Sequence, residues 1–317
     1  MKILYVVHRY FPFPGGSEYY VRDLAEETLK QGHDVTVFAS TNKGDQNGVK
    51  VTDDPYVLAK KWDLIVVHGG DVISPDIVHA HADHIKSPVM YMIIKPSESD
   101  VCLKGLALHK YLAWSTSFDL NHIIKHGMQH KAVYVRHSIV RERSIGGRLN
   151  GITMRVRLGI KGPMYVTAGG FWPHKEMKSL AASFNNSDLG TLLCFGYEDH
   201  GDRPQDTNKV MTIMGAEREL VLDTIAEADG YILNSSEEGF GLVLLESMIN
   251  KTPWFGRDLA GAHEMQEYGH VYDTEAQLIT MLSEFRKSEY DVETPYNYVI
   301  ANRLTEHTVS DILSVFK

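Results

Sequence analysis

Two glutamates, Glu238 and Glu246, stand eight positions apart and flank a glycine-rich turn at 239–241. Glycine allows left-handed backbone and lets a ligand approach closely. The apolar run after the turn predicts a helix over 242–249, whose first N–H groups and positive dipole end would face the turn. This arrangement favours phosphate at the turn and sugar hydroxyls at the carboxylates. The alternative is that both glutamates are solvated charges at a helix end.

A second loop, near the amino terminus, also contains glycines directly before a predicted helix. An apolar strand is predicted at 2–7, and the loop after it contains Gly15 and Gly16. Ser17 is predicted to cap a helix with apolar residues on one face, and a strand follows at 35–39. Glycines at this point of a β-α-β unit often contact phosphate. The loop lacks the G-x-G-x-x-G pattern, which disfavours an oxidoreductase, and the glycines could also serve only the turn.

The elements that must position these residues alternate between strand and helix along the chain. A length of 317 residues suits two domains, each able to bury a core. The alternation predicts two doubly wound α/β domains. We place an amino-terminal domain at 1–145 and a second domain at 146–294, joined by a glycine-containing hinge within 141–162. A carboxy-terminal helix at about 295–317 is expected to pack back on the first domain.

The composition is that of a soluble globular protein, with 43% hydrophobic and 23% charged residues. No apolar run approaches the roughly 20 residues of a transmembrane helix. The apolar part of the first residues is too short for a signal peptide. The two cysteines, Cys102 and Cys194, have no metal-like spacing. These features predict a cytoplasmic protein without a transmembrane segment.

The net charge of −9 is distributed unevenly. Residues 131–161 carry eight Lys or Arg and one acid, Glu142, which gives this basic band a charge of +7. Such a band either faces an anionic ligand or acceptor, or forms a solvated linker.

A group of potential metal ligands occurs at 75–84, and it consists of His79, His81, Asp83 and His84. On a single helix only residues three or four apart share a face. The four side chains would therefore spread around the helix, and we expect no metal site there.

The stretch 234–264 resembles the E-x7-E motif of retaining glycosyltransferases of family 4, in the form E238-G-F-G-L-V-L-L-E246. The stretch 14–39 resembles the amino-terminal signature of the same family, in which a Gly-Gly loop faces the cleft between the domains. The resemblance covers nearly the whole chain and is weakest at 95–150. It implies the GT-B fold, in which two Rossmann-like domains face each other across a cleft.

The resemblance also implies a function: a hexosyl- or pentosyltransferase that uses a UDP-, GDP- or ADP-sugar and retains the anomeric configuration, with no cofactor and no metal. Glu246 would bind the ribose, Glu238 the transferred sugar and Lys175 the diphosphate, and His68 would line the acceptor side. The implied catalytic residues are Glu238, Lys175 and His68. The implied donor-binding residues are Gly15, Gly16, Lys175, Gly239, Phe240, Gly241, Leu242, Val243 and Glu246.

The chain departs from the family pattern at two positions. Lys95 and Pro96 follow the strand predicted at 88–94, where many members have a histidine. Gly170 stands where the family usually has an arginine that grips the diphosphate, and a lost guanidinium removes a bidentate phosphate contact. Candidates to replace the histidine are Lys95, Glu98 and His68, and candidates to replace the arginine are Arg257, Arg203 and an arginine of the basic band.

The acceptor hydroxyl is open among a small metabolite, a glycan, a lipid carrier and a nucleic acid. One alternative function is transfer to a modified DNA base or another phosphate-bearing acceptor, for which a duplex target would have to be flipped out. A second alternative is a nucleotide-sugar-binding protein without catalysis, suggested by the missing histidine and arginine.

Overall fold

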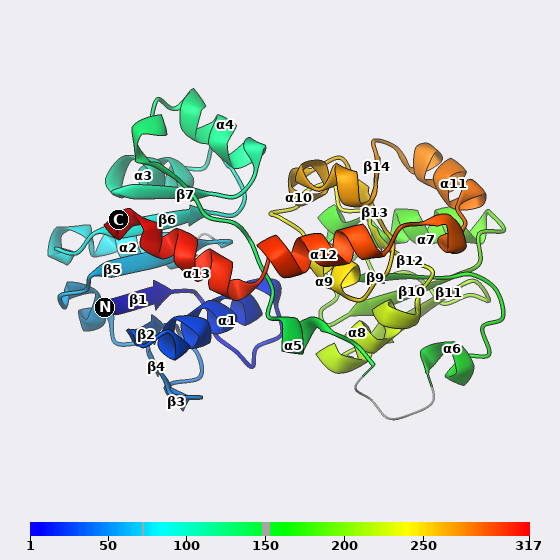
Figure 1. The fold of residues 1–317 in the computed structure, drawn as a ribbon, viewed down its shortest axis with the longest axis horizontal. Coiled ribbons are helices and arrows are strands. Elements are labelled where there is room, and N and C mark those ends of the chain that lie inside the picture. Colours follow the sequence, from blue (N-terminus) through cyan, green and yellow to red (C-terminus); the bar gives the residue numbers. More distant parts are fainter. Residues whose placement is uncertain (72, 148–152) are drawn as a thin grey trace. The chain divides into compact units, whose positions relative to one another are not determined.

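The computed structural model describes residues 1–71, 73–147 and 153–317. The chain divides into two compact units (Figure 1). Unit 1 comprises Met1–Ile139 and Arg303–Lys317, and unit 2 comprises Val140–Asn302. Among the described residues, no helix has the length and apolar character needed to cross a membrane.

Unit 1 is built on an eight-stranded sheet. Its strands are β1 (Lys2–Val6), β2 (Asp34–Phe38), β3 (Gly44–Gln46), β4 (Val49–Thr52), β5 (Leu64–Gly69), β6 (Val89–Ile93), β7 (Tyr111–Trp114) and β8 (Ala132–Tyr134). They lie in the order β3-β4-β2-β1-β5-β6-β7-β8, and only β3 and β4 pair antiparallel. The central strands are apolar almost throughout, as expected for parallel strands with both faces covered.

Helices connect the parallel strands of unit 1. They are α1 (Gly16–Lys30), α2 (Ile73–Ala80), α3 (Asp100–Leu108) and α4 (Ser117–Lys125). The carboxy-terminal helix α13 (Thr305–Leu313) also belongs to this unit, and no strand follows it. The chain runs from β1 through α1 to β2 on one side, and β5 then pairs with the other side of β1. The strand order therefore reverses between β1 and β5. Ligands of doubly wound sheets bind beyond the carboxyl ends of the strands at such a reversal.

Unit 2 contains a six-stranded sheet in which every neighbouring pair is parallel. Its strands are β9 (Met164–Ala168), β10 (Thr191–Gly196), β11 (Val210–Met214), β12 (Gly230–Leu233), β13 (Trp254–Arg257) and β14 (His270–Tyr272). They lie in the order β11-β10-β9-β12-β13-β14, so the strand order reverses between β9 and β12. The loops that follow these two strands must therefore lie next to each other.

The helices of unit 2 are α5 (Arg141–Ser144), α6 (Met154–Arg157), α7 (Met177–Asn185), α8 (Arg218–Glu227), α9 (Leu242–Ile249), α10 (Ala260–Glu264), α11 (Glu275–Glu284) and α12 (Glu293–Asn302). Each unit has its own apolar core on its sheet, with Trp62 and Tyr91 among the large side chains in unit 1 and Tyr165 and Phe255 in unit 2. Helix α9 spans the residues predicted from the apolar run after the glycine turn.

The region predicted as one carboxy-terminal helix contains two. Helix α12 packs on α9 in unit 2, whereas α13 packs on α1 in unit 1 (Figure 1). The helix is interrupted because Leu304 has an extended backbone and pairs with Ile139 as an isolated parallel bridge. Asp311 then fixes α13, since its carboxylate accepts hydrogen bonds from Arg136 Nε at 2.6 Å and Nη2 at 3.0 Å.

Helix α1 begins at Gly16, two residues earlier than a cap at Ser17 predicts, and Ser17 is not its cap. Gly15 occupies the capping position, and because it has no side chain the helix lacks a side-chain cap. The Glu18 carboxylate fills the space where a Cβ of Gly15 would lie, and it pairs with Arg9 at 3.2 Å. Gly15 therefore serves close packing by Glu18, while the space beside Gly16 is open.

Candidate functional site

The strand reversal of unit 2 brings together two side chains that are 63 positions apart. Lys175 ends a short 3-10 turn after β9, and Glu238 lies in the loop after β12. Lys175 Nζ lies 2.6 Å from Glu238 Oε2, and the two side chains are 19% and 18% exposed. Glu238 also accepts hydrogen bonds from the Ser235 hydroxyl at 3.3 Å and the Gly239 N–H at 3.2 Å. The pair is thus a partly buried, hydrogen-bonded ion pair beyond the carboxyl ends of β9 and β12.

The charge state of Glu238 follows from these contacts. Burial by itself would raise the pKa of this carboxyl, but the Lys175 ammonium and the Gly239 and Ser235 donors outweigh it and leave the pKa below its usual value. Glu238 is therefore ionised at neutral pH and can accept hydrogen bonds from hydroxyl groups. Lys175 has three N–H donors, so it can hold Glu238 and still contact an anion.

The turn at 239–241 has the geometry that its glycines predict. Gly241 caps α9 with a left-handed φ of 81°, and a Cβ there would lie 2.9 Å from Leu233 Cδ2. The first N–H groups of α9, at Leu242 and Val243, have no acceptor within their own helix. They stand at the positive end of the helix dipole, a favourable position for an anion.

Helix α10 supports this turn from behind. A Cβ at Gly261 would overlap the Phe240 carbonyl oxygen, so α10 and the turn pack with backbone against backbone. The Phe240 side chain is itself buried. The turn is therefore held on both sides, by Leu233 and by α10, and its N–H groups have a fixed direction.

Glu246 lies within α9 and pairs with an arginine that our sequence analysis did not identify. The side chain of Glu246 is 11% exposed, and its Oε1 accepts a hydrogen bond from Arg218 Nη2 at the start of α8. No local pattern links these two residues, which are 28 positions apart. A carboxylate has about four acceptor sites, so the contact with Arg218 leaves capacity for hydroxyl donors.

Gly170, which replaces an expected arginine, is covered by aromatic rings. A Cβ at this position would lie 2.7 Å from the Trp172 indole and 3.4 Å from Tyr197. Trp172 in turn stacks on His200 with the rings 13° from parallel. A larger side chain at 170 would have to displace the indole, which explains why glycine stands there.

Arg257, one candidate replacement for that arginine, is engaged elsewhere. Its Nη2 donates to Glu176 Oε2 at 2.7 Å and lies 3.9 Å from Glu275. Glu176 has a left-handed φ of 51° at the start of α7, so this ion pair holds a strained residue in place. Arg257 acts in unit 2 as a structural contact of the loop that carries Lys175.

The predicted site residues of unit 1 lie at the reversal between β1 and β5. Gly15 and Gly16 follow β1, and His68 is on β5. His68 is 3% exposed, its Nδ1 accepts a hydrogen bond from the Gly70 N–H at 3.1 Å, and burial lowers its pKa to about 4. At neutral pH the ring is therefore uncharged with its proton on Nε2, which makes it a hydrogen-bond donor.

The other candidates for the acceptor side have structural partners. Lys125 Nζ binds Glu98 at 2.5 Å.

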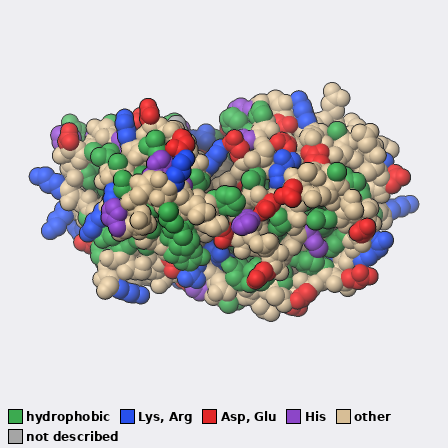
Figure 2. Space-filling model, turned by 90° about the horizontal axis from the view of Figure 1, so that it is seen from above, with side chains coloured by type: hydrophobic (Ala, Val, Ile, Leu, Met, Phe, Trp, Pro, Cys, Tyr) green, Lys and Arg blue, Asp and Glu red, His purple; other side chains and the backbone are tan. Residues whose placement is uncertain are grey.

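In the basic band, Lys131 donates to the carbonyl groups of Leu106 and Ala107 at the end of α3. Arg136 pairs with Asp311, and Arg155 pairs with Asp229 at 2.6 Å, while Arg148 lies outside the described residues. On the face shown in Figure 2, Lys and Arg side chains are interspersed with Asp and Glu.

The histidines of the group at 75–84 also have separate partners. His79 Nε2 lies 3.2 Å from His109 Nε2, and the two rings stack. His81 Nδ1 bonds to the Ile77 carbonyl at 2.9 Å. Helix α2 ends at Ala80 and a 3-10 turn follows at Ala82–His84, so the four residues do not share one helix as predicted, and the expectation of no metal site stays a prediction.

No protein-family model and no curated protein sequence matches this chain. Solved structures do match it over its whole length. HepE of Anabaena, in complex with UDP-glucose, has a TM-score of 0.81 at 15% identity, over 99% of this chain and 100% of that one. Sucrose-phosphate synthase from Thermosynechococcus elongatus has a TM-score of 0.79 at 14% identity, over 99% and 98% of the two chains.

A UDP-forming α,α-trehalose-phosphate synthase from Burkholderia xenovorans, in complex with glucose-6-phosphate, has a TM-score of 0.74 at 11% identity, over 100% of this chain and 99% of that one. At such low identities the similarity shows the fold alone. The chain has the GT-B fold with two doubly wound, Rossmann-like units, which confirms the predicted fold class.

Proposed function

We propose that this protein is a retaining glycosyltransferase that moves a sugar from a nucleotide-diphosphate sugar to a hydroxyl acceptor without a metal ion. The observation that carries this proposal is the Lys175–Glu238 ion pair, which lies at a strand reversal and shares its loop with the capped amino terminus of α9. The UDP-glucose bound to the structural neighbour HepE supports a nucleotide-sugar donor.

The chemical demand of the reaction is the negative charge that builds on the leaving diphosphate. Preorganised donors aimed at that charge stabilise the transition state more than the ground state. The Lys175 ammonium and the N–H groups of Gly241, Leu242 and Val243 are the donors we assign to this role. Both groups are fixed before the ligand arrives, since Glu238 holds Lys175 and α10 supports the turn.

The two glutamates would orient the donor. Glu238 is ionised and accepts hydrogen bonds from hydroxyls of the transferred sugar, while Glu246, held by Arg218, accepts those of the ribose. The incoming acceptor hydroxyl would attack from the face on which the diphosphate departs and pass its proton to a phosphate oxygen. His68, uncharged at neutral pH, would donate a hydrogen bond from Nε2 rather than act as a base.

A transfer assay with UDP-, GDP- and ADP-sugars tests the proposal, with the anomeric configuration of the product determined by NMR. Lys175→Ala should lower turnover by about 100-fold or more, the usual loss for one oxyanion-stabilising donor. Glu238→Gln should also lower turnover, because it removes the ionised acceptor for the sugar hydroxyls and the partner that holds Lys175. Lys178→Ala removes an exposed lysine whose Nζ donates to the Gly201 carbonyl oxygen, and it should leave turnover unchanged. Undiminished turnover in Lys175→Ala and Glu238→Gln would contradict the assignment.

A nucleotide-sugar-binding protein without turnover is the second candidate. It is favoured by Gly170, which supplies no guanidinium for the diphosphate and beside which the Trp172 indole lies where a Cβ would be. Calorimetric binding of a UDP-sugar, together with no transfer to any acceptor and no hydrolysis, would support this second function.

Transfer to DNA is less favoured because Arg136 and Arg155 of the basic band are paired with acids.

A further inference from the structure

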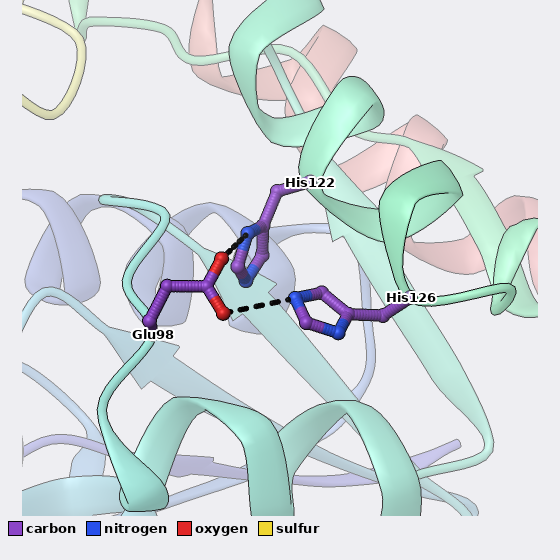
Figure 3. Close-up of side chains that lie close together, drawn as sticks. All are labelled: Glu98, His122 and His126. Atoms are coloured by element: carbon purple, nitrogen blue, oxygen red, sulfur yellow. Dashed lines mark ion pairs between the residues drawn. The ribbon is translucent and has the colours of Figure 1, made fainter.

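A group of three potential metal ligands lies in unit 1 (Figure 3). Glu98 belongs to the loop between β6 and α3, while His122 lies on α4 and His126 ends it. His126 Nε2 is 3.4 Å from Glu98 Oε2, and His122 Nδ1 is 3.8 Å from Glu98 Oε1. The three ligand atoms all lie within 4.8 Å of one another.

The geometry of this group suits a small divalent cation. Histidines four positions apart lie on one face of a helix and often bind one metal ion together. In a tetrahedral zinc site with bonds of about 2.1 Å, neighbouring ligand atoms are roughly 3.4 Å apart. The distance from His126 Nε2 to Glu98 Oε2 has this value. The distance from His122 Nδ1 to the other carboxylate oxygen, Glu98 Oε1, exceeds it by a few tenths of an ångström.

The hydrogen-bonding state of the histidines also favours a cation. His122 is buried, and its Nε2 lies 3.8 Å from Cys102 Sγ on α3. A proton on Nε2 leaves Nδ1 with a lone pair directed at the Glu98 carboxylate, an arrangement that a cation between them would stabilise. His126 Nε2 is a buried atom whose neighbour Glu98 Oε2 lies 3.4 Å away, at the long limit of a hydrogen bond.

Lys125 is the competitor for this position. Its Nζ lies 2.5 Å from Glu98 Oε1, and the two side chains are 64% and 56% exposed. Exposed ion pairs of this kind contribute little free energy, so a divalent cation with two imidazole ligands can displace the ammonium. The lysine would then swing into solvent.

We propose that Glu98, His122 and His126 form a zinc-binding site that ties the loop after β6 to α4. Two imidazoles and one carboxylate are ligands that zinc accepts, and water would complete the tetrahedron. All three ligands lie in unit 1, whereas the residues assigned above to the diphosphate lie in unit 2. The zinc ion would therefore hold the loop after β6 and would not contact the departing diphosphate.

The test is calorimetric titration of the full chain with Zn²⁺, and with Co²⁺ while its visible absorption is recorded. We expect one site and the intense absorption of tetrahedral Co²⁺. His126→Gln and Glu98→Gln should each weaken binding at least about tenfold, because each removes a ligand. Lys125→Gln should tighten binding several-fold, since it removes the competing ammonium.

His79→Gln is the matched control, because it removes an imidazole of the other close histidine pair in unit 1 and should leave the affinity unchanged. His122 is buried and its replacement could impair folding, so the partly exposed His126 provides the decisive variant. Absence of Zn²⁺ binding, or equal affinity in the wild type, His126→Gln and Glu98→Gln, would overturn the proposal.

Discussion

The contact between Lys175 and Glu238 is the centre of the candidate site at the scale of single residues. Each side chain alone would be a poorly solvated charge, and each stabilises the other at 2.6 Å. The sequence analysis identified both residues through a family resemblance, and the structure shows that they touch. Their catalytic role stays a prediction.

Removal of Lys175 should destabilise unit 2 in a pH-dependent way. In Lys175→Ala, burial is no longer offset by the ammonium, so the pKa of Glu238 should rise above its unfolded value. The unpaired, ionised carboxylate should then lower the free energy of unfolding by about 1–3 kcal/mol at pH 7. This cost should shrink as the pH falls below the raised pKa of the folded state, and it should vanish well below about 4.3, where the carboxyl is protonated in both states.

Differential scanning calorimetry at pH 7 and pH 5 measures this effect. A second variant, Lys175→Ala/Glu238→Gln, should recover part of the lost stability at pH 7, because it removes the unpaired charge. A loss in Lys175→Ala that is equal at both pH values would mean that Glu238 does not carry the effect.

Arg218 offers a second residue-scale prediction. Arg218→Ala would leave the largely buried Glu246 carboxylate without its guanidinium partner, so the variant should bind UDP more weakly and melt at a lower temperature. Calorimetric titration with UDP and thermal melting measure both effects. Arg286→Ala, which removes an exposed arginine bonded to the Ser283 and Phe285 carbonyl groups, should change neither.

At the scale of elements, the turn at 239–241 and helix α9 form one unit with α10 behind them. The boundaries of α9 could be predicted because glycine and apolar spacing are local signals. The packing of Gly261 against the Phe240 carbonyl could not be predicted, because this contact joins two segments that are separated by β13 in the sequence.

Gly241→Ala tests whether this turn must be left-handed. The variant places a Cβ at φ 81° and 2.9 Å from Leu233, which should cost about 1–2 kcal/mol and misdirect the N–H groups of α9. UDP affinity and melting temperature should both fall. Gly162→Ala adds a methyl group with no atom within 4 Å and is the control, expected to match the wild type. A Gly241→Ala protein with wild-type UDP affinity would show that the turn is not part of the donor site.

At the scale of the whole molecule, four histidines of unit 1 are buried among the described residues, and three of them have strongly lowered pKa values. Burial lowers the pKa of His68 to about 4 and the pKa values of His109 and His137 to about 3. In the unfolded chain these groups titrate near 6.5, so the unfolded state binds more protons as the pH falls from about 6.5 toward 4. Stability should therefore decrease over that range.

His109→Gln separates this effect from general acid sensitivity. His109 lies beside His79 and takes no part in the proposed transfer. The wild type should lose about 2 kcal/mol more stability than the variant between pH 7 and pH 5, because only the wild type has this histidine to protonate on unfolding. Chemical unfolding at the two pH values measures the difference, and equal losses would contradict it.

The sequence by itself determined the local features of this protein: apolar parallel strands, the glycine turn, the bounds of α9 and two α/β units of doubly wound type. Each depends on residues close in the chain, whose spacing sets helix or strand. The strand orders of the two sheets needed the tertiary structure, and they decide which loops meet. They bring Lys175 to Glu238 at the reversal between β9 and β12.

Tertiary packing likewise decided the partners that no local pattern encodes. Arg218 reaches Glu246, the Trp172 indole covers Gly170, and α4 carries its histidines to Glu98. The physical reason is that spacing along one element defines a face, whereas the neighbour of that face depends on how separate elements pack. The residue types of the candidate site could therefore be recognised from the sequence, and the contacts that hold them in position could not.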